Sequence, residues 1–256
     1  MKVGLQLYTI RDLLAKNVEQ VMERVSSFGY EGVQFAGFYD QSSEEILRLL
    51  KMYSLHPAGS HVDLELLSKE KIQETMEYHH TIGNRLLIVP YVEENERKTK
   101  DDYKRLAEKL NIAGEQVQRE GFSLAYHNHD FEFSKVEGKL PLDLLTEETV
   151  PDYVSFELDA YWAKYAGFDP ISIMLKLGSR LKSLHVKDIA KKEGKTVSTV
   201  IGNGEIDWLK FASYAAKLEV EWLIVEQEHF EKDPLVETEE NYLRLHSILK
   251  EMRSAQ

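Results

Sequence analysis

Short blocks in which apolar residues recur at every second position, or run continuously, occur eight times along the chain. In Lys2–Tyr8, Val3, Leu5 and Leu7 alternate with small or polar residues, which is the period of a strand. Arg85–Val89 is a continuous apolar run, typical of a strand buried on both faces. The pattern predicts strands over Lys2–Tyr8, Gly32–Ala36, His56–His61, Arg85–Val89, the start of Phe122–Phe133, Tyr153–Leu158, Leu181–Val186 and Trp222–Val225.

The segments between these strands carry apolar residues three and four positions apart, which is the helical period. Asn17 precedes one such segment and Gly29 follows it, and these residue types commonly begin and end helices. The pattern predicts helices from Asn17 to Phe28, from Ser42 or Ser43 through Leu50, over Ser68–Ile82, Thr99–Glu120 and Pro141–Glu147, from Asp169 to Gly178, and over Ile206–Leu218 and Thr238–Met252.

Eight strand–helix pairs predict the α/β class and a (β/α)8 TIM barrel. The strands start roughly 25–35 residues apart, as a (β/α)8 barrel requires. A doubly wound open sheet is the rival, but no Gly-rich phosphate turn follows Tyr8. No linker or shift of composition divides the chain, so we expect a single domain over residues 1–256.

Ionisable residues gather where the last four predicted strands end. The carboxyl ends of barrel strands face one shared mouth, so these side chains should meet there. Burying so many charges costs several kcal/mol each unless a cation or a partner compensates. The strand period aims the following pairs at the mouth: His127 and His129, Glu157 and Asp159, His185 and Lys187, and Glu226 and Glu228.

These residue types point to a metal site of mixed nitrogen and oxygen ligands. Asp159, His185 and Glu226, together with either His127 or Glu132, would suit Mn²⁺, Zn²⁺, Co²⁺ or Fe²⁺. The imidazoles make Mg²⁺ alone a poorer match. The pattern does not choose among the other four metals.

Composition narrows the class of protein further. The chain has Cys 0, which excludes a thiolate metal site, and a net charge of −12, which argues against a broad nucleic-acid surface. No apolar run is long enough to span a bilayer, and MKVGLQLY at the amino terminus does not resemble a signal peptide. We therefore expect a cytoplasmic protein without a nucleic-acid or membrane partner. The sequence does not decide whether the protein forms a homo-oligomer.

Six stretches stand in order along the chain at barrel spacing: SHV at Ser60–Val62, YHNHDFEF at Tyr126–Phe133, ELDAYW at Glu157–Trp162, LHVKD at Leu184–Asp188, GNGEIDW at Gly202–Trp208 and VEQE at Val225–Glu228. In these stretches the sequence resembles the sugar phosphate isomerase/epimerase-like family of xylose isomerase-like TIM barrels. That family is related to inosose dehydratases, ketose 3-epimerases and endonuclease-IV-like proteins. The resemblance covers nearly the whole chain and is more specific for the fold than for the substrate.

Such proteins usually bind a divalent metal through a strand-five Glu, a strand-six Asp, a strand-seven His and a strand-eight Glu. The resemblance implies that these ligand positions fall on His127, Asp159, His185 and Glu226. His127 departs from the usual Glu, which in the ketose epimerases is one of two acid/base carboxylates. This departure argues against epimerisation by two carboxylates.

The resemblance also implies which residues touch the substrate. Trp162 would be an apolar wall, Lys187 a cation for a hydroxylate, carbonyl or phosphate, and His61 a further contact. We place His129 and Glu228 beside them as substrate-binding residues. The expected substrate is a small sugar, keto-sugar or polyol, phosphorylated or not.

We predict from this a divalent-metal-dependent sugar or polyol isomerase or epimerase. It would abstract a proton next to a carbonyl through a metal-stabilised enediolate, with Glu226 and His127 moving protons. The alternative is a keto-sugar or inosose dehydratase, a lyase acting by β-elimination. The single well-placed ligand carboxylate, Glu226, favours elimination or one-sided isomerisation over symmetric epimerisation.

Two alternatives belong to other classes of protein. An endonuclease-IV-like phosphodiesterase would need a larger His/Glu metal cluster and a basic face for DNA, against which the acidic balance argues. A non-catalytic sugar-binding barrel would keep the ligand set without exchanging substrate protons.

Three lesser features carry weaker predictions. His79-His80 lies on a predicted helix away from the mouth, so we expect both residues at the surface. Gly202–Gly204 is either a close approach to a phosphate or a plain turn. Glu132 is a candidate ligand, base or partner of His129, of which we favour the last.

Overall fold

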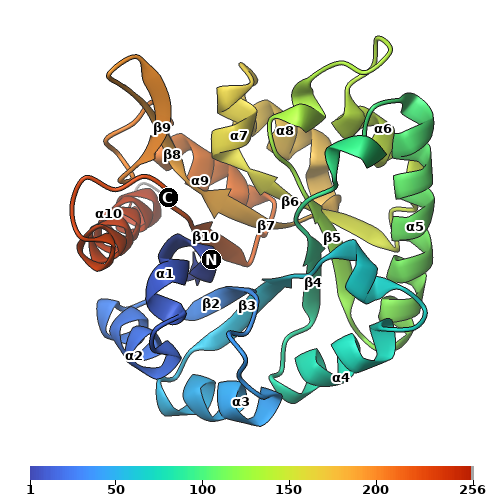
Figure 1. Ribbon diagram of the computed structural model, residues 1–256. Coiled ribbons are helices and arrows are strands. Elements are labelled where there is room, and N and C mark those ends of the chain that lie inside the picture. Colours follow the sequence, from blue (N-terminus) through green and yellow to red (C-terminus); the bar gives the residue numbers. More distant parts are fainter. Residues whose placement is uncertain (255–256) are drawn as a thin grey trace.

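In a computed structural model, which describes residues 1–254, eight parallel strands close into a barrel (Figure 1). Around the barrel each strand pairs with the next in chain order, and β1 pairs with the last strand, β10. The predicted (β/α)8 barrel is thus confirmed and the open sheet is excluded. The barrel strands are β1 (Lys2–Gln6), β2 (Gly32–Ala36), β3 (His56–His61), β4 (Leu86–Val89), β5 (Ser123–His127), β6 (Val154–Asp159), β7 (Leu181–Val186) and β10 (Trp222–Val225).

Helices surround the barrel, as the view in Figure 1 shows. Three predicted starts differ from the structure by two residues or more: α4 begins at Ile72 and not at Ser68, α9 at Trp208 and not at Ile206, and α10 at Pro234, four residues before Thr238. Proline is a residue type suited to a first helical turn. The helices are α1 (Arg11–Leu14), α2 (Val18–Phe28), α3 (Ser43–Met52), α4 (Ile72–Thr81), α5 (Lys100–Arg119), α6 (Pro141–Glu148), α7 (Ala160–Tyr165), α8 (Pro170–Leu177), α9 (Trp208–Lys217) and α10 (Pro234–Ser254).

Local signals explain where several helices begin and end. The Asn17 side chain accepts a hydrogen bond from the Gln20 N–H (3.0 Å) at the start of α2, and Gly29 ends that helix at φ +103°. Thr99 and Asp102 form a reciprocal capping box at the start of α5. Within residues 1–254, no helix is long and apolar enough to cross a membrane.

Apolar side chains are divided between two clusters. The large one lies between the strands and the helices. The small one consists of Ala58, Trp222 and Ile224. Space around Trp222 is tight, because a Cβ added at Gly32 would lie 2.6 Å from its ring. Several buried side chains on the barrel strands are polar, among them Gln6, Gln34, Glu157, Ser183 and His185.

After β7 the sequence pattern predicts a polar loop over Lys187–Asn203, but much of this segment is regular structure. It forms an antiparallel hairpin of β8 (Asp188–Lys192) and β9 (Lys195–Thr199). The backbone N–H groups of Gly202 and Gly204 donate to Asp188 Oδ2 at 2.8 and 3.2 Å. This turn is therefore closed by a carboxylate of its own chain, which supports the plain-turn interpretation over a phosphate site.

Candidate metal centre and catalytic site

Three predicted ligands meet at the mouth of the barrel. The donor atoms of Asp159, His185 and Glu226 all lie within 4.8 Å of one another, and all three side chains are buried. His185 Nδ1 lies 2.7 Å from Glu226 Oε2 and 3.9 Å from Asp159 Oδ2. Neighbouring strand ends bring them together, since β7 pairs with both β6 and β10.

The bonding of Asp159 fits a bound cation. Its Oδ1 accepts the Trp162 N–H (3.1 Å) at the start of α7, whereas Oδ2 is buried and has no hydrogen-bond partner among residues 1–254. Burial, opposed by the Lys187 charge and reinforced by Glu226, raises the pKa of Asp159 to about 7. A buried carboxylate oxygen without a partner is costly unless something binds it. One imidazole and two carboxylates suit a divalent transition metal.

At His185, a bound cation would replace a proton on the ring. Burial alone would lower the pKa of His185, but Glu157 and then Glu226 raise it to about 10. The ring is therefore protonated at neutral pH and donates from Nδ1 to Glu226. A metal at Nδ1 would displace that proton, so metal binding should release a proton at this residue.

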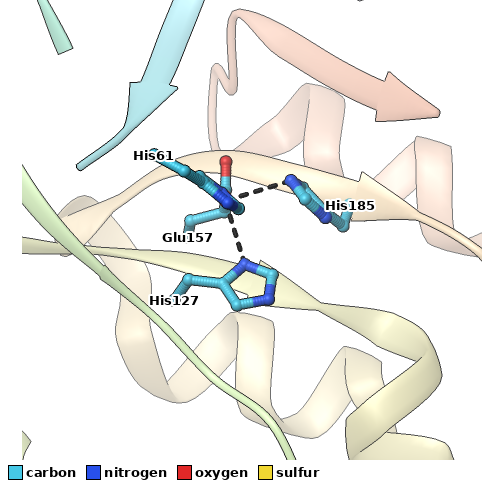
Figure 2. A group of neighbouring side chains, drawn as sticks. All are labelled: His61, His127, Glu157 and His185. Carbon is cyan, nitrogen blue, oxygen red and sulfur yellow. Dashed lines mark hydrogen bonds and ion pairs between the residues drawn. The ribbon is translucent and has the colours of Figure 1, made fainter. Parts of the chain in front are cut away.

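Glu157 is the centre of a second group of ligand-type residues, drawn in Figure 2. Its Oε1 lies 2.8 Å from His61 Nε2, 2.9 Å from His127 Nδ1 and 3.0 Å from His185 Nε2. Gln34 and Ser183 donate to its other oxygen. Burial would raise the pKa of Glu157, but His185 and the other bonded imidazoles hold it well below its ordinary value. One buried carboxylate thus orients three rings.

His127 belongs to this second group and not to the cluster of Asp159, His185 and Glu226. A carboxylate only accepts hydrogen bonds, so His127 Nδ1 carries the proton and Nε2 keeps a free lone pair. Burial lowers the pKa of His127 to about 4, although Glu157 opposes that shift. His127 is therefore a neutral imidazole whose Nε2 can accept a proton or a metal, and its role as a fourth ligand stays a prediction.

Glu132, the other candidate fourth ligand, is engaged elsewhere. Its oxygens accept the Tyr126 hydroxyl (2.6 Å) and the backbone N–H of His129 (2.7 Å). The favoured partnership with His129 therefore involves the backbone and not the ring. Burial raises the pKa of Glu132 to about 7.

Lys187 brings a buried positive charge to the same place. Its side chain is 1% exposed, pairs with Glu228 and lies 3.8 Å from Glu226 Oε1. The ammonium lies 4.9 Å from the Tyr161 ring centroid and 5.1 Å from that of Trp162. Burial alone would lower the pKa of Lys187, but Glu226 and the other carboxylates raise it above its ordinary value.

A cavity of about 720 Å³ opens beside these groups. It extends from the strand ends to α4 and is lined by residues of both. Among the predicted site residues, those that line it are His61, His127, His129, Trp162, Glu226 and Glu228.

The sequence pattern does not indicate the roles of two residues at the mouth and in the cavity wall. The strand period places Glu157 at the mouth but assigns it no function. Only the structure shows that its carboxylate is the hydrogen-bond partner of three imidazoles. The surface prediction for His79 was wrong: the side chain is 3% exposed and lines the cavity, whereas His80 is exposed as expected. A signal existed, because His79 shares the buried face of α4 with Ile72 and Met76.

Comparison with known proteins agrees with the barrel fold. Residues 22–252 match the model of the xylose isomerase-like TIM barrel family. The chain is 23% identical to an inosose dehydratase of Geobacillus kaustophilus, over 89% of this chain and 84% of that protein. It is 25% identical to an inosose dehydratase of Clostridium tetani, over 85% and 84% of the two chains.

A solved structure extends the likeness to three dimensions. A sugar phosphate isomerase/epimerase of Parabacteroides distasonis is 25% identical, with a TM-score of 0.81, and the match covers 96% of this chain and 94% of that one. An L-ribulose 3-epimerase shares the fold at 12% identity and a TM-score of 0.76, over 99% and 96% of the chains. The chain thus belongs to the xylose isomerase-like TIM barrel family, in which these relatives are named as sugar and inosose enzymes.

Proposed function

We propose that this protein is a divalent-metal-dependent dehydratase that removes water from a keto-sugar or keto-polyol by β-elimination. One observation carries the proposal: a neutral imidazole, His127, is fixed by a buried carboxylate beside the ligand set of Asp159, His185 and Glu226. Such a site combines one oriented base with a place for a Lewis acid. Proton abstraction next to a carbonyl needs both.

The residues of the chain provide a path for the proton. His127 Nε2 accepts the proton from the carbon next to the carbonyl, and Glu157 stabilises the imidazolium that forms. The electron pair of that C–H bond becomes a C=C bond as the C–O bond on the neighbouring carbon breaks. The imidazolium then returns the proton to the departing hydroxyl, which leaves as water. One base thus serves both steps on one face of the substrate.

Charged groups around this path orient the substrate. The Lys187 ammonium, held by Glu228 and the face of Trp162, donates to a substrate oxygen. His61 and His129 contribute further polar atoms to the cavity wall. When bound, Mn²⁺, Zn²⁺, Co²⁺ or Fe²⁺ would polarise the carbonyl, and Asp159, His185 and Glu226 would hold it.

The relatives support elimination over the isomerase or epimerase reaction. The matched proteins of Geobacillus kaustophilus and Clostridium tetani, both named inosose dehydratase, align over more than four fifths of their length. Isomerisation and epimerisation begin with the same proton abstraction, so the outcome after that step separates the three reactions.

Turnover in deuterated water tests the reaction class. With Mn²⁺ present, an inosose and a panel of ketoses would be followed by NMR and mass spectrometry. We expect a dehydrated product, which is 18 mass units lighter than the substrate when the same reaction is run in ordinary water. Clean inversion or ketose–aldose exchange with deuterium at the reacting carbon, and no dehydrated product, would contradict elimination and restore the isomerase or epimerase. No exchange with any substrate would favour a binding protein.

A further inference from the structure

The cavity continues well beyond the catalytic groups. Its far end is formed by α4 and by the segments after β2 and β3, with Phe38, Leu66, Tyr78 and His79 as lining residues. A volume of about 720 Å³ lies in the upper part of the roughly 300–1,000 Å³ range of small-molecule sites. A single sugar ring bound beside His127 would leave the α4 end unfilled.

The walls of this α4 end have the chemistry of a ring-binding subsite. The rings of Phe38 and Tyr78 pack with centroids 4.2 Å apart, and the Tyr78 hydroxyl is tied to the Gln41 carbonyl at 2.8 Å. At the rim, Tyr8, Leu66 and Tyr91 are at least 40% exposed although they are large and apolar. Aromatic and apolar walls of this kind bind flat faces of ligands.

His79 adds a polar atom without a partner. Its Nδ1 lies 2.7 Å from the Thr75 carbonyl, which only accepts, so Nδ1 carries the proton and Nε2 is an acceptor. Nε2 is buried and has no hydrogen-bond partner among residues 1–254. The ring borders the cavity and meets Phe38 edge-on at 5.4 Å. A buried acceptor of this kind needs a donor, and a ligand hydroxyl would supply one.

We propose that the α4 end is a second subsite, which binds a hydroxylated ring attached to the reacting keto-sugar. This inference rests on the proposed function for the position of the reacting ring. Phe38 and Tyr78 contact the flat face of the attached ring, and His79 Nε2 accepts a hydrogen bond from one of its hydroxyls. The substrate class is then a keto-sugar glycoside, whose second ring is either a sugar or a phenol.

Binding measurements separate this subsite from the reaction. With Mn²⁺ present, calorimetry would compare fructose with lactulose, which is fructose bearing a galactosyl ring, and glucose with arbutin, which is glucose bearing a phenol. We expect at least one ring-bearing ligand to bind about tenfold more tightly than its parent sugar, since it gains a hydrogen bond and apolar contacts. A gain for lactulose alone identifies a sugar ring, and a gain for arbutin alone identifies a phenol.

Matched variants assign the gain to this subsite. His79→Leu should remove most of it, and His79→Gln, whose side chain can offer an acceptor near Nε2, should keep most of it. Phe38→Ala, which trims a partly exposed wall, should also reduce it, whereas His80→Leu on the exposed side of α4 should not.

Two results would overturn the subsite. One is equal affinity of parent and ring-bearing ligands in the wild type, and the other is a gain that survives both His79→Leu and Phe38→Ala. A wild type that dehydrates a single-ring substrate but shows no gain would refute the subsite alone. A gain without dehydration of any substrate would keep the subsite and refute the dehydratase.

Discussion

Replacing Glu226 with glutamine should lower kcat/KM at least about 10³-fold, which corresponds to a barrier higher by about 4 kcal/mol. Glu226 Oε2 lies 2.7 Å from His185 Nδ1, and Oε1 lies 3.8 Å from Lys187 Nζ. Burial would raise the pKa of Glu226, but Lys187 and His185 hold it well below its ordinary value, so it is ionised. Glutamine keeps the shape and removes one of the two carboxylates that would balance a divalent cation.

Metal content and activity should be lost together in this variant. Elemental analysis and steady-state kinetics on the same preparation measure both. Glu228→Gln is the matched control, because Glu228 also pairs with Lys187 but lies outside the ligand cluster. We expect that control to keep its metal. Full metal occupancy in Glu226→Gln would show that the ligand assignment is wrong.

Glu157→Gln should have the second largest effect, on both stability and activity. The carboxylate is completely buried and bonds to three imidazoles, and glutamine would place an amide N–H₂ among ring N–H donors. Breaking such a buried charged network costs about 3–5 kcal/mol. For a chain of this size that corresponds to a melting temperature lower by roughly 10 °C. The loss of ring orientation should also cost roughly 10–100-fold in metal affinity or activity.

Calorimetric melting and metal titration of Glu157→Gln would check both effects. Glu237→Gln is the control for burial: Glu237 is also buried and accepts bonds from Gln227 and from the backbone of Glu231 and Lys232, but it belongs to neither group of ligand-type residues. It should lose stability but keep the metal affinity of the wild type. Equal metal affinity in both variants would mean that Glu157 has only a structural role.

Much of the fold could be predicted because its signals are local. The two-residue period and continuous apolar runs indicate the eight barrel strands, and single residues such as Asn17 and Gly29 indicate helix ends. The hairpin of β8 and β9 was missed because its polar segment lacks the apolar period of a buried strand. The early start assigned to α4 was wrong because residues 68–71 form a turn, in which the Lys71 N–H donates to the Ser68 carbonyl.

The positions of site residues can be predicted from the sequence where the alternation along a strand alone determines which way a side chain points. Asp159, His185 and Glu226 converge as that rule requires. The sequence does not indicate that His127 lies in a different group from Asp159, His185 and Glu226. That separation arises because His127 Nδ1 bonds to Glu157 on the neighbouring strand, which depends on side-chain geometry. Likewise, His79 is buried because α4 packs against the rest of the barrel. The helical period indicates which residues share a face of α4, but it does not determine how that face packs.

We expect Asp159, His185 and Glu226 to form a metal centre at the barrel mouth. Anomalous diffraction from crystals grown with Zn²⁺, recorded on both sides of the zinc absorption edge, tests it most directly. We expect a peak roughly 2.0–2.2 Å from Asp159 Oδ2, His185 Nδ1 and a carboxylate oxygen of Glu226. A peak held instead by His61, His127 and Glu157, or no peak at the mouth, would contradict it.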